Sequence, residues 1–186
     1  MTMPSVQWQL APDELKDDDA LLSAVVEEHR LIYERYFRDE PEISHQMPIT
    51  THMFRRLGEW RVFLVLTPWM LARVFVPDNP PDIELPTSWG AEARQGLAYT
   101  VMGPTFKLDL LTGTQKAHLN YSSGFGHYLL HPLILSMNDY ETPSEVFMAW
   151  NGVIESRNEN LKKMQRKNQQ QNEITRREFF SGVQGK

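Results

Sequence analysis

Residues 57–77 read LGEWRVFLVLTPWMLARVFVP, and this stretch decides how the rest of the chain can fold. Its first apolar run, Val62–Leu66, has no polar position, which is typical of a strand buried on both faces. Pro68 cannot donate a hydrogen bond to a neighbouring strand, so a central strand should end just before it. A second apolar run then continues to the final proline. The stretch therefore predicts two buried strands joined by a tight corner that holds Trp69 and Met70.

Two amphipathic helices are predicted, one before and one after this stretch. Apolar residues recur at helical spacing over residues 18–38, and Asp17, Asp18 and Asp19 supply a capping oxygen and negative charge at the start of that helix. The second helix, residues 143–158, begins in the capping box TPSE, with proline at the first helical position.

Strand patterns fill the middle of the chain. Apolar or alternating runs predict strands at 60–66, 74–77, 96–103, 106–110 and 128–137, with a weaker alternation at 49–54. Gly58-Glu59 suits a hairpin turn, whereas residues 112–126 are rich in Gly, Ser and Thr and predict a loop. We therefore expect an α+β fold: a single domain with a mostly antiparallel sheet of about five strands, flanked by an N-terminal and a C-terminal helix.

The folded domain is expected to cover residues 17–157. The polar residues 1–16 should form a flexible arm. Apolar residues become rare after residue 157, so the second helix should fray there, and residues 158–186 should form a polar, basic tail.

The composition excludes several classes of protein. The 186 residues include no cysteine, which excludes disulfides, thiol catalysis and cysteine-based zinc sites. No stretch approaches the roughly 18 apolar residues of a membrane span, so we expect no membrane insertion. The first residues lack a basic region followed by an apolar one, so we expect no signal peptide and a cytoplasmic location.

Charge is distributed unevenly along the chain. Residues 1–46 carry a net charge of −7, residues 47–150 one of −2, and residues 151–186 one of +4. An acidic head and a basic tail can attract each other or take different partners. Because the protein is acidic overall and its basic segment holds only two aromatic residues, nucleic acid is not an expected partner.

The apolar stretch and several later segments follow a recognisable pattern. Gly58 and Trp60 precede the first strand, residues 67–71 read TPWML, and residues 74–77 read VFVP. Later matches are YTVMG at 99–103, PL at 132–133 with SM at 136–137, and RREFF at 176–180. This set of segments resembles the HybE/HupJ family of [NiFe]-hydrogenase assembly chaperones.

The resemblance implies a non-catalytic maturation chaperone that needs neither a metal nor another cofactor. Such a protein binds the precursor of the hydrogenase small subunit, including its twin-arginine signal peptide, and holds back export until cofactors are inserted. Other hydrogenase maturation proteins are candidate further partners. The residues predicted to contact a partner are Trp60, Thr67, Pro68, Trp69, Met70, Leu71 and Pro77.

Acidic residues are candidate docking points for the paired arginines of such a client. Carboxylates bind guanidinium groups in a fork geometry, which favours Glu27, Glu28 and Glu59. A surface ion pair contributes about 0–1 kcal/mol, whereas micromolar binding needs about −8 kcal/mol. An apolar groove must therefore supply most of the binding energy. Trp69 and Met70 offer large, adaptable contact for it, although packing in the core is the commoner fate of such residues.

The tail carries a twin-arginine-like sequence of its own. Residues 176–180 read RREFF, and no apolar segment follows them. The predicted tail motif, Arg176, Arg177, Phe179 and Phe180, would occupy the signal-binding groove when no client is bound.

Two other function classes stay open. His118, His127 and His131 are candidates for a metal-handling or small hydrolytic protein. For hydrolysis, Ser122 or Ser123 and Asp109 would have to join His127. A strand would place the second and third of these histidines about 13 Å apart, which argues against a shared metal. The long polar helix is the basis of the other hypothesis, a scaffold for further maturation factors.

Overall fold

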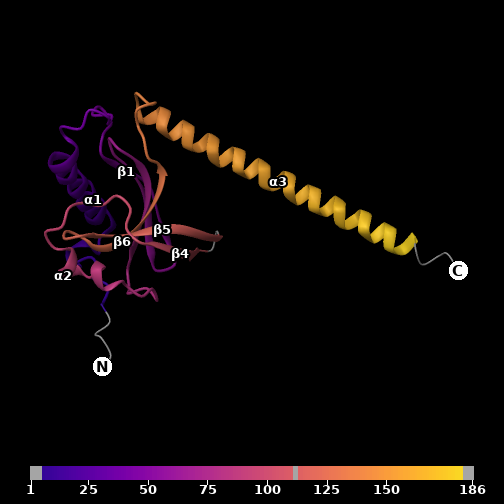
Figure 1. Ribbon diagram of the computed structural model, residues 1–186, viewed down its shortest axis with the longest axis horizontal. Coiled ribbons are helices and arrows are strands. Elements are labelled where there is room, and N and C mark those ends of the chain that lie inside the picture. Colours follow the sequence, from indigo (N-terminus) through magenta and orange to yellow (C-terminus); the bar gives the residue numbers. More distant parts are fainter. Residues whose placement is uncertain (1–5, 111–112, 182–186) are drawn as a thin grey trace. The chain divides into compact units, whose positions relative to one another are not determined.

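The computed structural model describes residues 6–110 and 113–181, with side chains described up to residue 173. The chain divides into two compact units, Met1–Pro143 and Ser144–Lys186. The first unit holds the sheet and the short helices, and the second holds the body of one long helix, α3 (Pro143–Ser181) (Figure 1). In no helix of the described ranges is there a stretch long and apolar enough to cross a membrane.

The first unit alternates helical segments with strands. Its helices are η1 (Asp13–Leu15), α1 (Asp18–Ile32), the π-helix η2 (Tyr33–Phe37), η3 (Thr87–Trp89) and α2 (Ala91–Arg94). Its strands are β1 (Thr50–Leu57), β2 (Trp60–Leu66), β3 (Leu71–Pro77), β4 (Thr105–Leu110), β5 (Gly113–Ser122) and β6 (Gly126–Ile134). The predicted α+β class is confirmed, with six strands in the described sheet instead of about five.

The predicted strand–corner–strand unit forms the middle of the sheet. The strand order is β1-β2-β3-β6-β5-β4, and every neighbouring pair is antiparallel. At the corner, the Thr67 amide donates to the carbonyl of Met70 at 2.9 Å, and the Thr67 hydroxyl accepts from the Met70 amide at 3.0 Å. The threonine thus closes the turn that Pro68 forces, and residues 57–77 place two fully apolar strands at the centre of the fold.

The first helix follows its predicted pattern. Asp17 is the N-cap, and its carboxylate accepts a hydrogen bond from the Ala20 amide at 2.9 Å. The helix that was expected over 18–38 is present as α1 followed directly by η2. Its last turns are π-helical rather than α-helical, a geometry that often occurs at functional sites.

Each face of the sheet has its own apolar core. On one face, α1 and η2 pack against alternate residues of the central strands, including Phe63, Val65, Val74, Tyr128 and Leu130. On the other face, the N-terminal segment and the chain after β3 pack against the remaining residues, including Val62, Phe75, Leu119 and Leu129. Both faces of β2 and β3 are therefore buried, as their continuous apolar runs predict.

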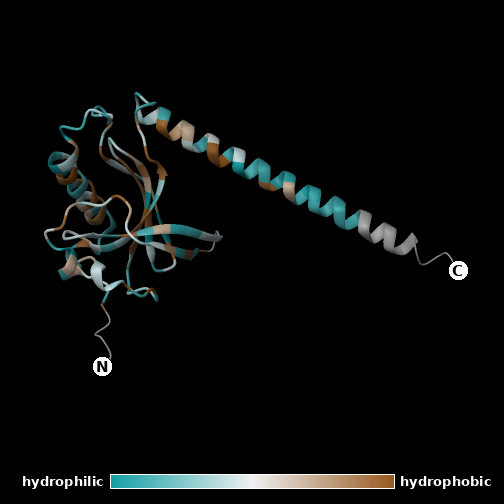
Figure 2. Cartoon of the chain, in the orientation of Figure 1, coloured by the Kyte–Doolittle hydropathy of each residue, from teal (hydrophilic) through white to brown (hydrophobic). Residues whose placement is uncertain are grey.

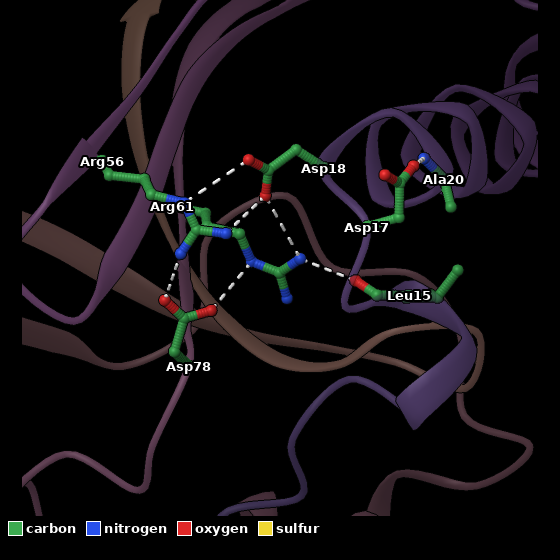
Figure 3. A network of polar contacts seen from close by, with 7 residues as sticks. All are labelled: Leu15, Asp17, Asp18, Ala20, Arg56, Arg61 and Asp78. Carbon is green, nitrogen blue, oxygen red and sulfur yellow. Dashed lines mark hydrogen bonds and ion pairs between the residues drawn. The ribbon is translucent and has the colours of Figure 1, made fainter.

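A polar network holds the start of α1 against the sheet (Figure 3). The Arg61 side chain is only 4% exposed; it donates to the Leu15 carbonyl at 2.6 Å and lies 3.1 Å from Asp78 and 3.8 Å from Asp18. Arg56 is half exposed and binds the same two carboxylates at 2.7 and 2.9 Å. Two arginines and two carboxylates thereby join α1, β1, β2 and the residue that follows β3.

Two of the strand and loop predictions are wrong. Residues 96–103 form no strand, because the sheet edge beside the end of β5 is taken by irregular chain: the Asn120 side chain donates to the Val101 carbonyl at 3.1 Å. Residues 112–126, expected to be a loop, contain β5, whose alternate residues Ala117 and Leu119 are buried. Turn-forming residues stand only at the ends of that segment, so its Gly and Ser content was misleading.

The ends of the expected domain also differ from the prediction. Within the expected arm 1–16, the described part packs on the sheet: Trp8 is buried and donates to the Ile83 carbonyl at 2.8 Å. The helix expected to fray after residue 157 continues to Ser181. Figure 2 shows that its turns between residues 158 and 173 are mostly hydrophilic, so strong helix formers such as Gln, Lys and Glu maintain this part of the helix rather than an apolar face.

Candidate functional site

A cavity of about 290 Å³ opens in the first unit, at the end of α1. One wall comes from α1 and η2, with Glu28, Leu31, Arg35 and Tyr36. A second wall is the irregular chain from Arg94 to Thr100, and a third is the β5–β6 hairpin from Asn120 to Tyr128. Segments far apart in the sequence therefore meet at one concave surface, as is usual for a binding site.

Glu28 is the acidic residue in this cavity. In an ideal geometry, a Cβ atom on Gly124 would lie 3.5 Å from its Oε2, so the carboxylate reaches the turn between β5 and β6. No hydrogen bond or ion pair joins the Glu28 carboxylate to another side chain of the described residues. A carboxylate that lines a cavity and has no cationic partner is suited to receive a cation from outside.

Tyrosine side chains line the same cavity as this carboxylate. Burial raises the pKa of Tyr128, and electrostatic interaction with Tyr99 and Glu28 raises it further. The pKa of Tyr121 is raised by burial and then by Glu28. Burial also raises the pKa of Tyr99, while the Trp69 indole N–H acts in the opposite direction. All three phenols are therefore neutral at physiological pH, and they offer ring faces and hydroxyls rather than charge.

Two arginines from different segments of the chain, one in η2 and one in α2, line the cavity. The Arg94 guanidinium lies 4.2 Å from the centre of the Trp89 ring and donates to the Ala98 carbonyl at 3.3 Å. The Arg35 guanidinium lies 5.6 Å from the centre of the Tyr36 ring. Neither forms an ion pair with a carboxylate of the described residues. The cavity is thus lined by one carboxylate without a cationic partner and two guanidinium groups without a carboxylate partner among the described residues.

Apolar side chains form the rim. Leu31 is 50% exposed and Leu97 is 56% exposed, and both line the cavity. Large apolar side chains that remain exposed beside a concave site are typical of surfaces that bind another molecule. The rim therefore offers apolar contact next to the charged groups.

The corner residues that were predicted to contact a partner lie in the core. Trp69 is 6% exposed and stacks on Phe37 with ring centres 4.3 Å apart. The other four, Thr67, Pro68, Met70 and Leu71, are buried as well. Phe37 directly follows Tyr36, which lines the cavity, so the corner supports the cavity from beneath. A partner could touch these residues only if the domain opened first.

The remaining predicted contact residues lie on the opposite face of the sheet. Trp60 is half-buried, and its ring meets the edges of Trp8 and Phe75 with centres 6.4 and 6.3 Å away. Pro77 is buried and pairs in register with Trp60. Neither residue lines the cavity.

The structure separates the three glutamates that were predicted to dock arginines. Glu28 lines the cavity, whereas Glu27 points to the exposed face of α1 and pairs with Arg30 at 2.5 Å. Glu59 lies in the β1–β2 turn and accepts from the Asn79 amide at 3.2 Å. Only the first of the three is placed beside apolar and aromatic groups that a client could also contact.

The tail motif Arg176, Arg177, Phe179 and Phe180 lies outside the residues whose side chains the structure describes. Its place relative to the cavity therefore stays a prediction.

The histidines of the alternative hypothesis are not gathered at one point. His127 is buried; it accepts from the Gln9 amide at 2.8 Å and donates to the Trp89 carbonyl at 2.8 Å. His118 is opposite Leu130 in the β5–β6 register, so it lies on the other face of the sheet from His127 and His131. Through the described part of the chain, no group of three or more metal-binding side chains is close enough to hold an ion.

The hydrolytic arrangement is also dispersed. The Ser122 hydroxyl accepts from the Gly124 amide at 3.0 Å, and Asp109 accepts from the Thr114 hydroxyl at 2.6 Å near the far end of β5. Both ring nitrogens of His127 are already engaged with backbone groups. These contacts give each residue a structural partner of its own.

Sequence reasoning missed several residues of the cavity. Arg35 and Leu31 were interpreted only as parts of an amphipathic helix, and Arg94 and Leu97 fall where no functional pattern is visible. One signal was present: Leu31 is a large apolar residue outside the buried positions Leu21, Val25 and Ile32 of α1. An apolar residue beyond the core stripe of a helix is a reason to look for a second surface.

Comparison with known proteins identifies the family. The model of the family "[NiFe]-hydrogenase assembly, chaperone, HybE" matches residues 20–182. The solution structure of HybE from Escherichia coli is 20% identical, with a TM-score of 0.48 over 78% of this chain and 75% of that one. No curated protein matches. Because the family model spans most of the chain, the protein belongs to the HybE family of [NiFe]-hydrogenase assembly chaperones.

Proposed function

We propose that this protein binds the precursor of a hydrogenase small subunit in the cytoplasm, including its twin-arginine signal peptide. By holding that segment it delays export until cofactor insertion is complete, and it does so without catalysing a reaction. The site of binding is the cavity at the end of α1. Family membership supports a role in hydrogenase assembly, and the residues that line the cavity support recognition of arginine.

The observation that carries this proposal is the Glu28 carboxylate, which has no cationic partner among the described residues and lies in a cavity lined by neutral tyrosines. A guanidinium group can donate two parallel hydrogen bonds to a carboxylate and also stack on an aromatic ring. Lysine can do neither as well, because its ammonium is a compact charge without a flat face. The cavity therefore favours arginine over lysine, which is the distinction that a twin-arginine motif requires.

The apolar rim supplies the part of the affinity that charge cannot. A signal peptide places an apolar segment after its arginines, and Leu31 and Leu97 stand exposed beside the cavity. Burying a leucine-sized side chain contributes about 1.5–3 kcal/mol. A few such contacts together with one charge-assisted hydrogen-bonded pair reach the range of micromolar binding.

The test is a calorimetric titration with a synthetic twin-arginine signal peptide of the host's hydrogenase small subunit. We expect micromolar binding by the wild-type protein and a loss of about tenfold or more with Glu28→Gln, since a hydrogen bond to a charged group contributes about 1.5–3 kcal/mol. A twin-lysine peptide should bind the wild type with a similar loss.

Glu27→Gln is the matched control, because it makes the same change one residue away, on a glutamate that pairs with Arg30 outside the cavity. It should leave the affinity unchanged. Equal losses with both variants, or no binding of the twin-arginine peptide at high concentration, would remove the cavity as the signal-binding site.

A further inference from the structure

The cavity carries more positive than negative charge, which the binding of arginines alone does not explain. Its charged lining residues are Glu28, Arg35 and Arg94. None of the three forms an ion pair within the described chain. A client segment that held only arginines would satisfy the carboxylate and would meet two like charges. A segment that also held an acidic group would satisfy all three.

Both arginines are held in place with donors to spare. The Arg94 guanidinium lies over the Trp89 ring and donates from one nitrogen to the Ala98 carbonyl, and the Arg35 guanidinium lies over the Tyr36 ring. Stacking on an aromatic ring fixes the plane of a guanidinium group while its edge N–H groups stay free. An edge of that kind is the surface that a carboxylate binds with two parallel hydrogen bonds.

The distance of the two arginines from Glu28 sets the spacing of the charged groups that the cavity can bind. Glu28 and Arg35 both line the cavity, and they are seven residues apart along α1 and the π-helical η2, which is about 10 Å along the axis at the α-helical rise per residue. An extended peptide rises about 3.3 Å per residue, and residues two apart share a face. An arginine and an acidic residue two positions apart, about 6.6 Å, can span the site because the arginine side chain itself covers the remaining distance.

We infer that the cavity recognises a client segment in which an acidic residue follows an arginine by two positions, with the arginine on Glu28 and the acidic group on Arg35 and Arg94. This rests on the proposed function of the cavity and adds a second determinant to it. A paired-arginine segment of the form Arg-Arg-Glu meets the requirement, whereas Arg-Arg-Gln keeps both arginines and lacks the negative charge. The two arginines of the protein thus select among twin-arginine segments instead of binding all of them equally.

The test uses the full-length protein and two synthetic signal peptides that differ only in Glu or Gln directly after the paired arginines. The Glu peptide should bind the wild type about five- to tenfold more tightly than the Gln peptide. In the double variant Arg35→Gln/Arg94→Gln the two peptides should bind alike, because the groups that tell them apart are gone. Arg38→Gln is the control: Arg38 is near Arg35 in sequence but pairs with Glu34 at 3.1 Å and does not line the cavity, so it should preserve the preference.

The outcomes separate this inference from the proposed function. Equal affinities of the two peptides for the wild type, with binding that still depends on Glu28, would overturn the acidic determinant and leave the signal-binding site standing. Absence of binding by both peptides would overturn both. A preference that survives in the double variant would place the acidic determinant on other residues and would also contradict the inference.

Discussion

The corner at residues 67–70 and the cavity at the end of α1 lie one layer apart and differ in what surrounds them. The corner holds the most conspicuous side chains of the sequence, and Trp69 is buried against Phe37. The cavity is built from less conspicuous residues, and its charged groups are unpaired. The comparison teaches that a segment can resemble a family strongly through residues buried in the core, while the groups that line a neighbouring cavity come from other segments.

The largest expected effect distinguishes the two regions by stability. Trp69→Ala should lower the free energy of unfolding by about 3–5 kcal/mol, because it leaves a large gap between α1 and the sheet. Leu97→Ala, at the exposed rim of the cavity, should change it by less than about 0.5 kcal/mol. Urea denaturation of both variants measures the difference. A small loss for the tryptophan variant would mean that the corner is not part of the core.

The next effect concerns the network that holds α1, and with it Glu28, against the sheet. Arg61→Met should cost about 2–3 kcal/mol, because it leaves Asp18 and Asp78 without their buried partner. Arg56→Met removes the half-exposed arginine from the same carboxylates and should cost clearly less. Denaturation curves of the two variants give the comparison. Equal losses of unfolding free energy in the two variants would show that the burial of Arg61 does not determine how much it stabilises the fold.

The buried His29, whose ring stacks on Trp69, should make the free energy of unfolding depend on pH. Burial lowers the pKa of His29 from its ordinary value of 6.5, so the native imidazole stays neutral while the unfolded chain takes up a proton. The stability that neutral His29 contributes is therefore fully present above about pH 6.5. It is lost as the pH falls below that value, by about 1.4 kcal/mol per pH unit. His29→Gln should reduce the slope between pH 7.5 and 5.5, measured by denaturation at each pH. An unchanged slope would assign it to other groups, such as His127, whose pKa burial also lowers.

The smallest expected effect on stability is at the apolar rim of the cavity, where substitutions should weaken binding of the signal peptide instead. Leu31→Ser and Leu97→Ser each replace an exposed apolar side chain, so unfolding free energies should stay within about 0.5 kcal/mol of the wild type. Affinity for the signal peptide should fall several-fold in each, as apolar contact is lost. Calorimetry and denaturation on the same samples test both parts. Unchanged affinity in the two variants would restrict recognition to the charged groups.

Much of the fold follows from local patterns in the sequence. The continuous apolar runs, the capping aspartate Asp17, the Gly58-Glu59 turn and the start of α3 at Pro143 act through neighbouring residues, and the structure has each of them. Strand β5 was missed because its polar outer face and its turn residues hid the alternation of Ala117 and Leu119. The length of α3 was underestimated because helix propensity was given less weight than the absence of an apolar face.

The candidate site was harder to predict because it depends on contacts between distant segments. Glu27 and Glu28 are equivalent in composition, and only the fold shows that the first pairs with Arg30 while the second faces the cavity. The π-helical turn that carries Arg35 and Tyr36 has no sequence signature in the pattern of apolar residues. Sequence reasoning therefore named both glutamates of the first helix as candidate docking residues and could not distinguish which of them lines the cavity.

The most direct test of the account is the ratio of the dissociation constants of Glu28→Gln and Glu27→Gln for the twin-arginine signal peptide. We expect a ratio of about ten or more, with both variants as stable as the wild type, because only one of the two carboxylates lines the cavity. A ratio near one would contradict the central claim, since the free carboxylate of the cavity would then contribute nothing to recognition of the client.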